Sequence, residues 1–298
     1  MKQKQLLAAL LAVSAGLCTA QQMPDTAFTY PNPHPHFATG KGPVVWLDEA
    51  HYNFHTLDGR YATFGKVLQA DGYRVQPNRQ KFTEASLANC SVLVIANALD
   101  SLSNTAWVAP NRSAFSASEI AAVNAWVKKG GSLFLIADHM PFAGSAQDLA
   151  QSFDIQFLNC FALDNRSRAT ERFYRDNKTL LDCELTRGID TVVTFTGSAF
   201  QLPKSAQAVL ALHHYTILEP ATAWQFTETT PHRDSRGLYQ LGYLNYGKGK
   251  VLVSGEAAMF SAQLAGPNQN PVGMNQPEAR QNGRLLLNIM EWLTQPRK

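Results

Sequence analysis

Short apolar runs alternate with amphipathic stretches along most of the chain. The first run lies between Gly42-Pro43 and Asp48. A continuous apolar run bounded in this way is typical of a strand that is buried on both faces of a parallel sheet. Further runs of this kind, at residues 91–96, 132–137 and 73–75, predict three more strands.

Helices are expected between these strands, because apolar residues recur there at intervals of three and four. The first covers residues 59–71. In the next, Ser116 and Glu119 have the spacing of a capping box, and Gly130-Gly131 would end the helix. Two further helices are expected at residues 145–153 and 280–293.

The last third of the chain predicts an antiparallel hairpin, formed by residues 238–245 and 250–254. Periodicity is weak between residues 155 and 235, where at least two strands are expected, near 191–196 and 208–212. The whole pattern predicts an α/β fold in which a mostly parallel sheet carries helices on both faces.

We predict one domain over residues 43–298, because the chain has no internal repeat and no linker to a second domain. The long loop at 264–278 is expected to cover one edge of the sheet. Residues 21–42 are rich in Pro, Gln and His and are expected to form an extended arm.

The N-terminus has the pattern of a signal peptide. Lys2 and Lys4 precede a short apolar run, and small residues precede an expected cleavage site after Ala20. Lipoprotein processing at Cys18 is the alternative, but Leu17 stands where that signal needs a small residue. We therefore expect a periplasmic or secreted protein, and no later stretch is long and apolar enough for a transmembrane helix.

Charge and cysteine content narrow the class further. Without residues 1–20, the 26 Lys and Arg fall to 24 against 23 Asp and Glu, which leaves a net charge of +1. This balance gives no electrostatic reason to expect nucleic acid or an anionic membrane as partner. Export makes disulfides feasible, and we expect Cys160 to pair with Cys183 while Cys90 packs as a thiol.

Candidate chemistry follows the expected strands. Parallel α/β sheets bind ligands beyond the carboxyl ends of their strands, and each of these strands is followed at once by polar residues. The ionisable ones are Asp48, His51, His55, Asp138, His139 and Glu256. Imidazole and carboxylate together are the ligand set of zinc, iron or manganese.

We assign three roles within this set. His51, His55 and His139 are the candidate metal ligands, with zinc as the first candidate metal; His51 and His55 would share a face if their segment were helical. Asp48, Asp138 and Glu256 are the candidate catalytic carboxylates, one of which could act as a general base on a metal-bound water. The candidate substrate-binding residues are Asn53, Asn97, Ser261 and Gln263.

Each residue also has a structural explanation. Asp48, Asp138 and Glu256 could accept backbone N–H groups, and His139 could stack in the core. Ser198, in Thr196-Gly197-Ser198, follows an expected strand but lacks the full pattern of a nucleophile elbow. The pair His213-His214 is interpreted as structural.

The strand order and motifs resemble the class I glutamine amidotransferase-like superfamily, in its uncharacterised bacterial branches, and the ThuA-like proteins more distantly. The resemblance is carried by residues 44–48 with His51, by 92–97, by the run 130–139 and by 255–257. It implies a flavodoxin-like fold. Where that superfamily has its catalytic cysteine, this chain has Asp138-His139, so the resemblance does not imply glutamine hydrolysis.

These observations lead to an exported hydrolase-like enzyme that acts on a small polar or carbohydrate-derived substrate. The alternative is a non-catalytic module that binds sugar or peptide, with Trp46, Tyr52, Trp107 or Phe142 as stacking surfaces. A structural envelope protein is the third hypothesis, and it predicts that the polar residues are scattered in space.

Overall fold

The computed structural model describes residues 22–167 and 170–296. The expected signal peptide lies outside the described residues. A nine-stranded sheet forms the centre, in the order β3-β2-β4-β5-β15-β14-β10-β6, and β11 also pairs with β14. The α/β fold class is thus confirmed.

Five neighbouring strands of this sheet run parallel, because β2 pairs with β3 and β4, and β5 pairs with β4 and β15. Their bounds are β2 Val44–Asp48, β3 Arg74–Asn78, β4 Val92–Ala96, β5 Ser132–Ile136 and β15 Gly249–Ser254. The remaining strands pair antiparallel. They are β6 Gln156–Leu158, β10 Ala199–Gln201, β11 Gln207–Ala211 and β14 Tyr239–Tyr246. The sheet is therefore mixed, and the expected hairpin is the β14–β15 pair.

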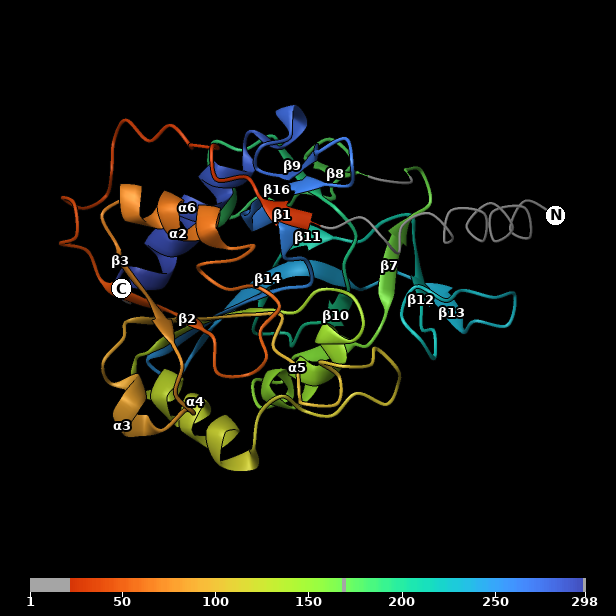
Figure 1. Ribbon diagram of the computed structural model, residues 1–298, viewed down its shortest axis with the longest axis horizontal. Helices are drawn as coiled ribbons and strands as arrows, with labels where there is room; N and C mark the ends of the chain where they lie inside the picture. The colour runs from red at the N-terminus through yellow and green to blue at the C-terminus, as the bar shows by residue number, and fades with distance from the viewer. Residues whose placement is uncertain (1–21, 168–169, 297–298) are drawn as a thin grey trace.

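Helices cover both faces of the sheet, as Figure 1 shows. On one face lie α2 (Ala62–Ala70) and α6 (Asn282–Thr294), whose apolar residues pack on β2, β4 and β5 in the larger core cluster. On the other face lie α3 (Glu84–Leu87), α4 (Ala117–Lys129) and α5 (Phe142–Gln151). The expected capping box of Ser116 and Glu119 opens α4, and Gly130 ends it at a φ of 129°.

Strands of three to five residues fill the region where the sequence has weak periodicity. β7 (Phe161–Asp164), β12 (Tyr215–Leu218) and β13 (His232–Asp234) form a separate sheet that projects from one side of the main sheet in Figure 1. β8 (Glu171–Tyr174) pairs with β9 (Thr191–Thr194). Such short strands leave no clear alternation of apolar and polar residues, since each places only one to three side chains on a face.

One expectation about the loops is wrong. The segment 264–278 is not a loop throughout, because β16 (Ala262–Ala265) and β17 (Asn270–Gly273) form a hairpin. β1 (Gln22–Pro24), at the start of the expected arm, adds a third strand to this hairpin. The segment 49–57, in which His51 and His55 would share a face if it were helical, has no helix, so that condition is not met.

The structure also tests the expected disulfide and the expected absence of a transmembrane helix. Cys90, Cys160 and Cys183 are all free, so the expected Cys160–Cys183 disulfide is wrong. Cys160 is fully buried, and burial raises the pKa of its thiol to about 12. Within residues 22–167 and 170–296, no helix combines the length and the apolar character that crossing a membrane requires.

Candidate functional site

Polar side chains that follow four parallel strands are connected at the carboxyl edge of the sheet. Asn97, after β4, accepts a hydrogen bond from the backbone N–H of Asp138, after β5, at 2.9 Å. The amide of Asn97 also donates to Nδ1 of His55 at 3.2 Å. His55 packs edge-on against Tyr61, whose hydroxyl donates to the carbonyl of Ala257, beyond β15. These contacts join the segments that follow β2, β4, β5 and β15.

Asp138 is the partly exposed carboxylate of this group. Its Oδ1 accepts the backbone N–H of His139 at 2.7 Å. Burial raises the pKa of Asp138 above its usual range, although the neighbouring His139 and the hydrogen bonds that it accepts oppose the shift. The group therefore keeps its proton at a higher pH than an ordinary aspartate.

Glu256, which follows β15, is fully buried. Its two carboxylate oxygens accept the backbone N–H groups of Ala258 and Met259, at 3.0 and 2.7 Å. Burial raises the pKa of Glu256 well above the usual value, and the negative charge of Asp138 raises it further. The two carboxyls thus titrate as a pair, and their charges work against each other.

His139 offers a proton acceptor beside this pair. Its Nδ1 lies 2.7 Å from the carbonyl oxygen of Met140, and since a carbonyl only accepts, Nδ1 carries the hydrogen. Neutral His139 therefore has its lone pair on Nε2. The ring is partly exposed and stacks on Phe161, with 4.6 Å between ring centroids and 11° between planes.

Aromatic rings surround His139 on several sides. Trp224 lies 4.8 Å away edge-on, Phe142 at 5.7 Å and Trp107 at 6.0 Å. Trp107 and Trp224 come from two loops that are tied together, because the N–H of Ala223 donates to the carbonyl of Trp107 at 2.9 Å. We call the group of Asn97, Asp138, His139 and Glu256, with the aromatic rings around His139, the strand-end site. Its polar groups lie at the carboxyl edge of the sheet, and the aromatic rings lie beside them.

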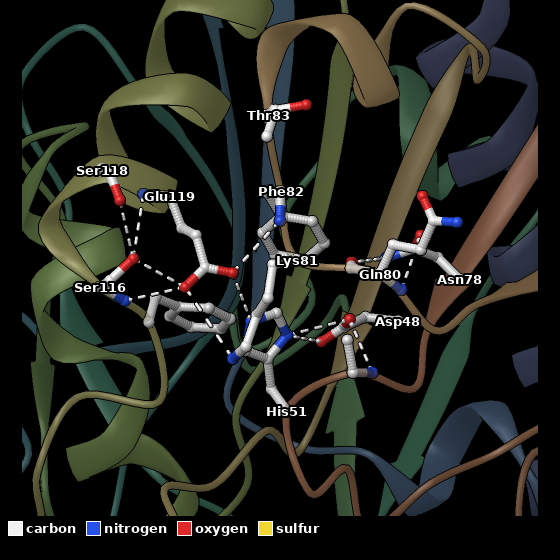
Figure 2. A network of polar contacts seen from close by, with 12 residues as sticks. Asp48, His51, Asn78, Gln80, Lys81, Phe82, Thr83, Ser116, Ser118 and Glu119 are labelled. Carbon is white, nitrogen blue, oxygen red and sulfur yellow. Dashed lines mark hydrogen bonds and ion pairs between the residues drawn. The ribbon is translucent and has the colours of Figure 1, made fainter.

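Asp48 and His51 form a second group, drawn in Figure 2. Nδ1 of His51 lies 2.8 Å from Oδ2 of Asp48, and Nε2 lies 2.9 Å from Oε1 of Glu119, at the start of α4. The rings of Phe82 and Phe115 enclose the imidazole at 4.7 and 4.8 Å. Burial opposes a charge on His51, but the hydrogen bonds and charges of the two carboxylates outweigh it and raise the pKa.

This arrangement occupies both ring nitrogens of His51. Asp48 in turn accepts hydrogen bonds from the amide of Asn53 at 3.0 Å and from the N–H of Ala50 at 3.2 Å. The predicted residues therefore divide into two neighbouring groups, one around His51 and one around Asp138. The loop between them is shared, since the N–H of Phe54 donates to the carbonyl of Asn97 at 3.0 Å.

The predicted metal ligands do not gather at one point. Across the described parts of the chain, no group of three or more His, Cys, Asp and Glu has an arrangement that could hold a metal ion. His55 is buried, and burial, with the charges of Arg60 and His139, lowers its pKa to about 3, so it is neutral.

Other predicted residues have structural partners. Ser261 donates to the carbonyl of Ala258 and accepts from the amide of Gln263, and both side chains are buried at the base of the β16–β17 hairpin. Ser198 is fully buried and donates to the carbonyl of Ala137 at 2.7 Å. His213 and His214 are exposed.

Two charged residues near the site were not predicted. Glu171, on β8, is buried and accepts a hydrogen bond from Thr194 at 2.9 Å. Burial raises its pKa to about 8, and the negative charges of Asp164 and Asp138 act in the same direction. Arg60 lies in the turn before α2. Neither residue follows a strand end or belongs to a motif, so the sequence carried no signal for them.

A cavity of about 430 Å³ lies at the opposite end of the sheet, where β4, β5 and β15 begin and α4 and α6 end. Its side-chain charge comes from Lys248 and Lys250, and the ammonium of Lys250 donates to the carbonyls of Trp292 and Gln295. The acid–base groups described above are absent from its lining, so we place the candidate site at the carboxyl edge.

Comparison with known proteins supports the fold only. No protein-family model matches the chain, and no curated protein matches it in sequence. Among solved structures, the mmIFT52 N-terminal domain is similar at a TM-score of 0.60 and 17% identity, over 85% of this chain and 99% of that one. A cytoplasmic protein from Salmonella typhimurium is similar at 0.51 and 13%, over 86% and 100%. A ThuA-like protein from Bacteroides uniformis gives 0.49 and 11%, over 88% and 95%.

Proposed function

We propose that the group around Asp138, His139 and Glu256 binds a small polar molecule and hydrolyses it by acid–base catalysis. The observation that carries the proposal is the hydrogen-bonded pair of Asp138 and His139 at the carboxyl edge of the sheet, where burial raises the pKa of the Asp138 carboxyl and that of the neighbouring Glu256. Pairs of titratable groups whose environments shift their pKa values in this way are concentrated at catalytic sites.

The proposed roles follow from the hydrogen bonds. Nε2 of His139 takes a proton from a water molecule, since Nδ1 is committed to the carbonyl of Met140. That water forms a new bond to the substrate, while protonated Asp138 gives its proton to the oxygen that leaves. One water is consumed and one bond to oxygen breaks, and both residues return to their first state by exchanging the proton with solvent.

Substitution of the two reacting groups tests this proposal. We expect Asp138→Asn and His139→Gln each to lower hydrolysis of a panel of nitrophenyl glycosides and esters by about 10²–10⁴-fold. Asp148→Asn, on the exposed side of α5, and the exposed His214→Gln are matched controls that leave the rate unchanged. Equal rates in Asp138→Asn and the wild type would refute the proposal.

A non-catalytic binding module is the second candidate, and the aromatic rings around His139 favour it. Trp107, Phe142 and Trp224 could stack on a sugar ring or a peptide side chain. Tyr52 is 56% exposed, and Trp46 packs in the smaller core cluster on the other face. Saturable binding of panel members without turnover would favour the module.

The resemblance to the glutamine amidotransferase-like superfamily remains part of the proposal. The five parallel strands, numbered along the chain, have the order 2-1-3-4-5, which supports a flavodoxin-like assignment for this half of the sheet. Asp138-His139 would then occupy the turn in which that superfamily has its cysteine, in keeping with chemistry other than glutamine hydrolysis.

A further inference from the structure

Arg60 has few partners for a partly buried charge. Its Nη1 donates to the carbonyl of Phe54 at 3.4 Å, and its guanidinium carbon lies 3.9 Å from the centre of the Phe54 ring. Its Nε is shielded from solvent and has no hydrogen-bond partner. Over residues 22–167 and 170–296, no carboxylate forms an ion pair with it.

Arg166 shows what a satisfied guanidinium is like in the same protein. Its Nε and Nη2 bind the two carboxylate oxygens of Asp164 at 2.9 and 2.8 Å, and this pairing raises its pKa. For Arg60 the shift has the opposite direction, because burial alone lowers its pKa. Buried charges are normally paired, since an unpaired one has lost hydration without compensation.

The position of Arg60 ties it to the strand-end site. Its charge acts on His55, which also feels the charge of His139. The Phe54 ring beneath it contacts Trp107 and Phe142, at 5.7 and 5.3 Å between centroids. Both of these rings also flank His139. Arg60 therefore lies at the edge of the same site.

We propose that Arg60 binds an oxyanion group, a carboxylate or a phosphate, on the molecule that the strand-end site accepts. The planar guanidinium binds both groups through paired hydrogen bonds, and the donors that its 3.4 Å hydrogen bond to the carbonyl of Phe54 does not use are available for them. Burial raises the pKa of Asp138 and of Glu256, so these carboxyls repel an incoming anion less than ordinary carboxylates would. The substrate class is thus a small acidic molecule, such as a sugar acid or a sugar phosphate. This inference rests on the proposed function for the location of the site.

Binding of matched ligand pairs tests the inference. Titration calorimetry on the full mature chain compares glucuronate with glucose, and glucose 6-phosphate with glucose, at constant ionic strength. The wild type is expected to bind at least one charged member about tenfold more tightly, equivalent to about 1.4 kcal/mol. Arg60→Gln abolishes this preference, and Arg60→Lys keeps more of it for the phosphate than for the carboxylate, because a lysine is a point charge.

Arg74→Gln is the matched control, since Arg74 also donates to a backbone carbonyl but lies on β3 at the opposite end of the sheet. Unfolding in acetate, phosphate and chloride at equal ionic strength gives a second readout that needs no sugar. Acetate or phosphate is expected to stabilise the wild type and Arg74→Gln but not Arg60→Gln.

Three results would overturn the inference: equal affinity of the wild type for charged and neutral members, no stabilisation by either anion, or an unchanged preference in Arg60→Gln. The proposed catalysis is tested separately. If Asp138→Asn retains both turnover and the anion preference, the catalytic role fails while the role of Arg60 stands. If Asp138→Asn loses turnover and Arg60→Gln keeps the anion preference, the role of Arg60 fails while the catalytic proposal stands.

Discussion

Nε2 of His51 lies 2.9 Å from Oε1 of Glu119, which is 68 positions further along the chain. Asp48 holds the other nitrogen of the same ring, so a buried imidazole stands between two carboxylates (Figure 2). Glu119 also caps α4 by accepting hydrogen bonds from Ser116. The contact therefore joins the loop after β2 to the first turn of a helix on the far side of β4.

Removal of the His51 imidazole should destabilise the protein strongly. His51→Ala leaves two buried carboxylates facing each other without their shared partner, and we expect the free energy of unfolding to fall by about 3–5 kcal/mol. Urea titration at pH 6 measures it. The exposed His214→Ala is the control, with an expected change below about 0.5 kcal/mol. A loss below about 1 kcal/mol in His51→Ala would contradict a charged His51 held between Asp48 and Glu119.

The group of Asp48, His51 and Glu119 also predicts a dependence of stability on pH. The folded pKa of His51 is raised above its unfolded value near 6.5, so its contribution is complete below that pH and is lost as the pH rises through the folded pKa. The pKa of Glu119 has the opposite shift, to about 2; burial works against this, but hydrogen bonds from Ser116, His51 and Phe82 dominate. The contribution of Glu119 is present above pH 4.5 and is lost as the pH falls toward 2. Unfolding measured from pH 3 to 9 should show both limbs, and His51→Gln should make the alkaline one shallower.

Glu171 should make a separate contribution to the pH dependence of stability, and its raised pKa fixes the direction. Its pKa is raised to about 8 in the folded protein, mainly by burial, so the folded state binds the extra proton between about pH 4.5 and 8. Stability therefore falls as the pH rises through this window. Glu171→Gln should flatten the slope and make the protein more stable than the wild type at pH 8. Equal slopes in the two proteins would contradict a protonated Glu171.

Part of the fold and of the candidate site could be predicted from the sequence, because the signals for it are local. Buried apolar runs gave β2, β4 and β5, and the capping box gave α4, because both signals are local. The rule that parallel strands end at one edge was enough to connect Asn97, Asp138 and the Glu256 segment.

The contact of His51 with Glu119 could not be predicted from the sequence, because Glu119 is distant along the chain and already had an explanation as part of a helix capping box. The division into two groups also depends on the irregular path of residues 49–57, which carries no periodic signal. Arg60 is an ordinary residue in a turn, and only the structure shows that, among the described residues, no carboxylate pairs with its charge.

Activity should depend on pH through Asp138. The proposed acid works only while protonated, so turnover falls as the pH rises through the raised pKa of Asp138. Burial raises the pKa of Glu256 well above its usual value, so Glu256 keeps its proton while Asp138 titrates, and Glu256→Gln should leave the falling limb in place. Rate profiles from pH 4 to 9 on one hydrolysed nitrophenyl substrate locate the limb. A limb that moves in Glu256→Gln, in a variant that folds normally, would show that Glu256 and not Asp138 is the titrating group.

The predicted divalent metal is testable on the same protein. His51 has both ring nitrogens bound by carboxylates, whereas Nε2 of His139 carries a lone pair beside Asp138. If zinc or another divalent ion binds, elemental analysis of the purified protein should show that His139→Ala lowers its content and His51→Asn does not. Chelation should then destabilise the wild type and leave His139→Ala unchanged. Absence of bound metal, together with equal stability before and after chelation, would contradict the prediction, while the acid–base roles of Asp138 and His139 would still stand on their own test.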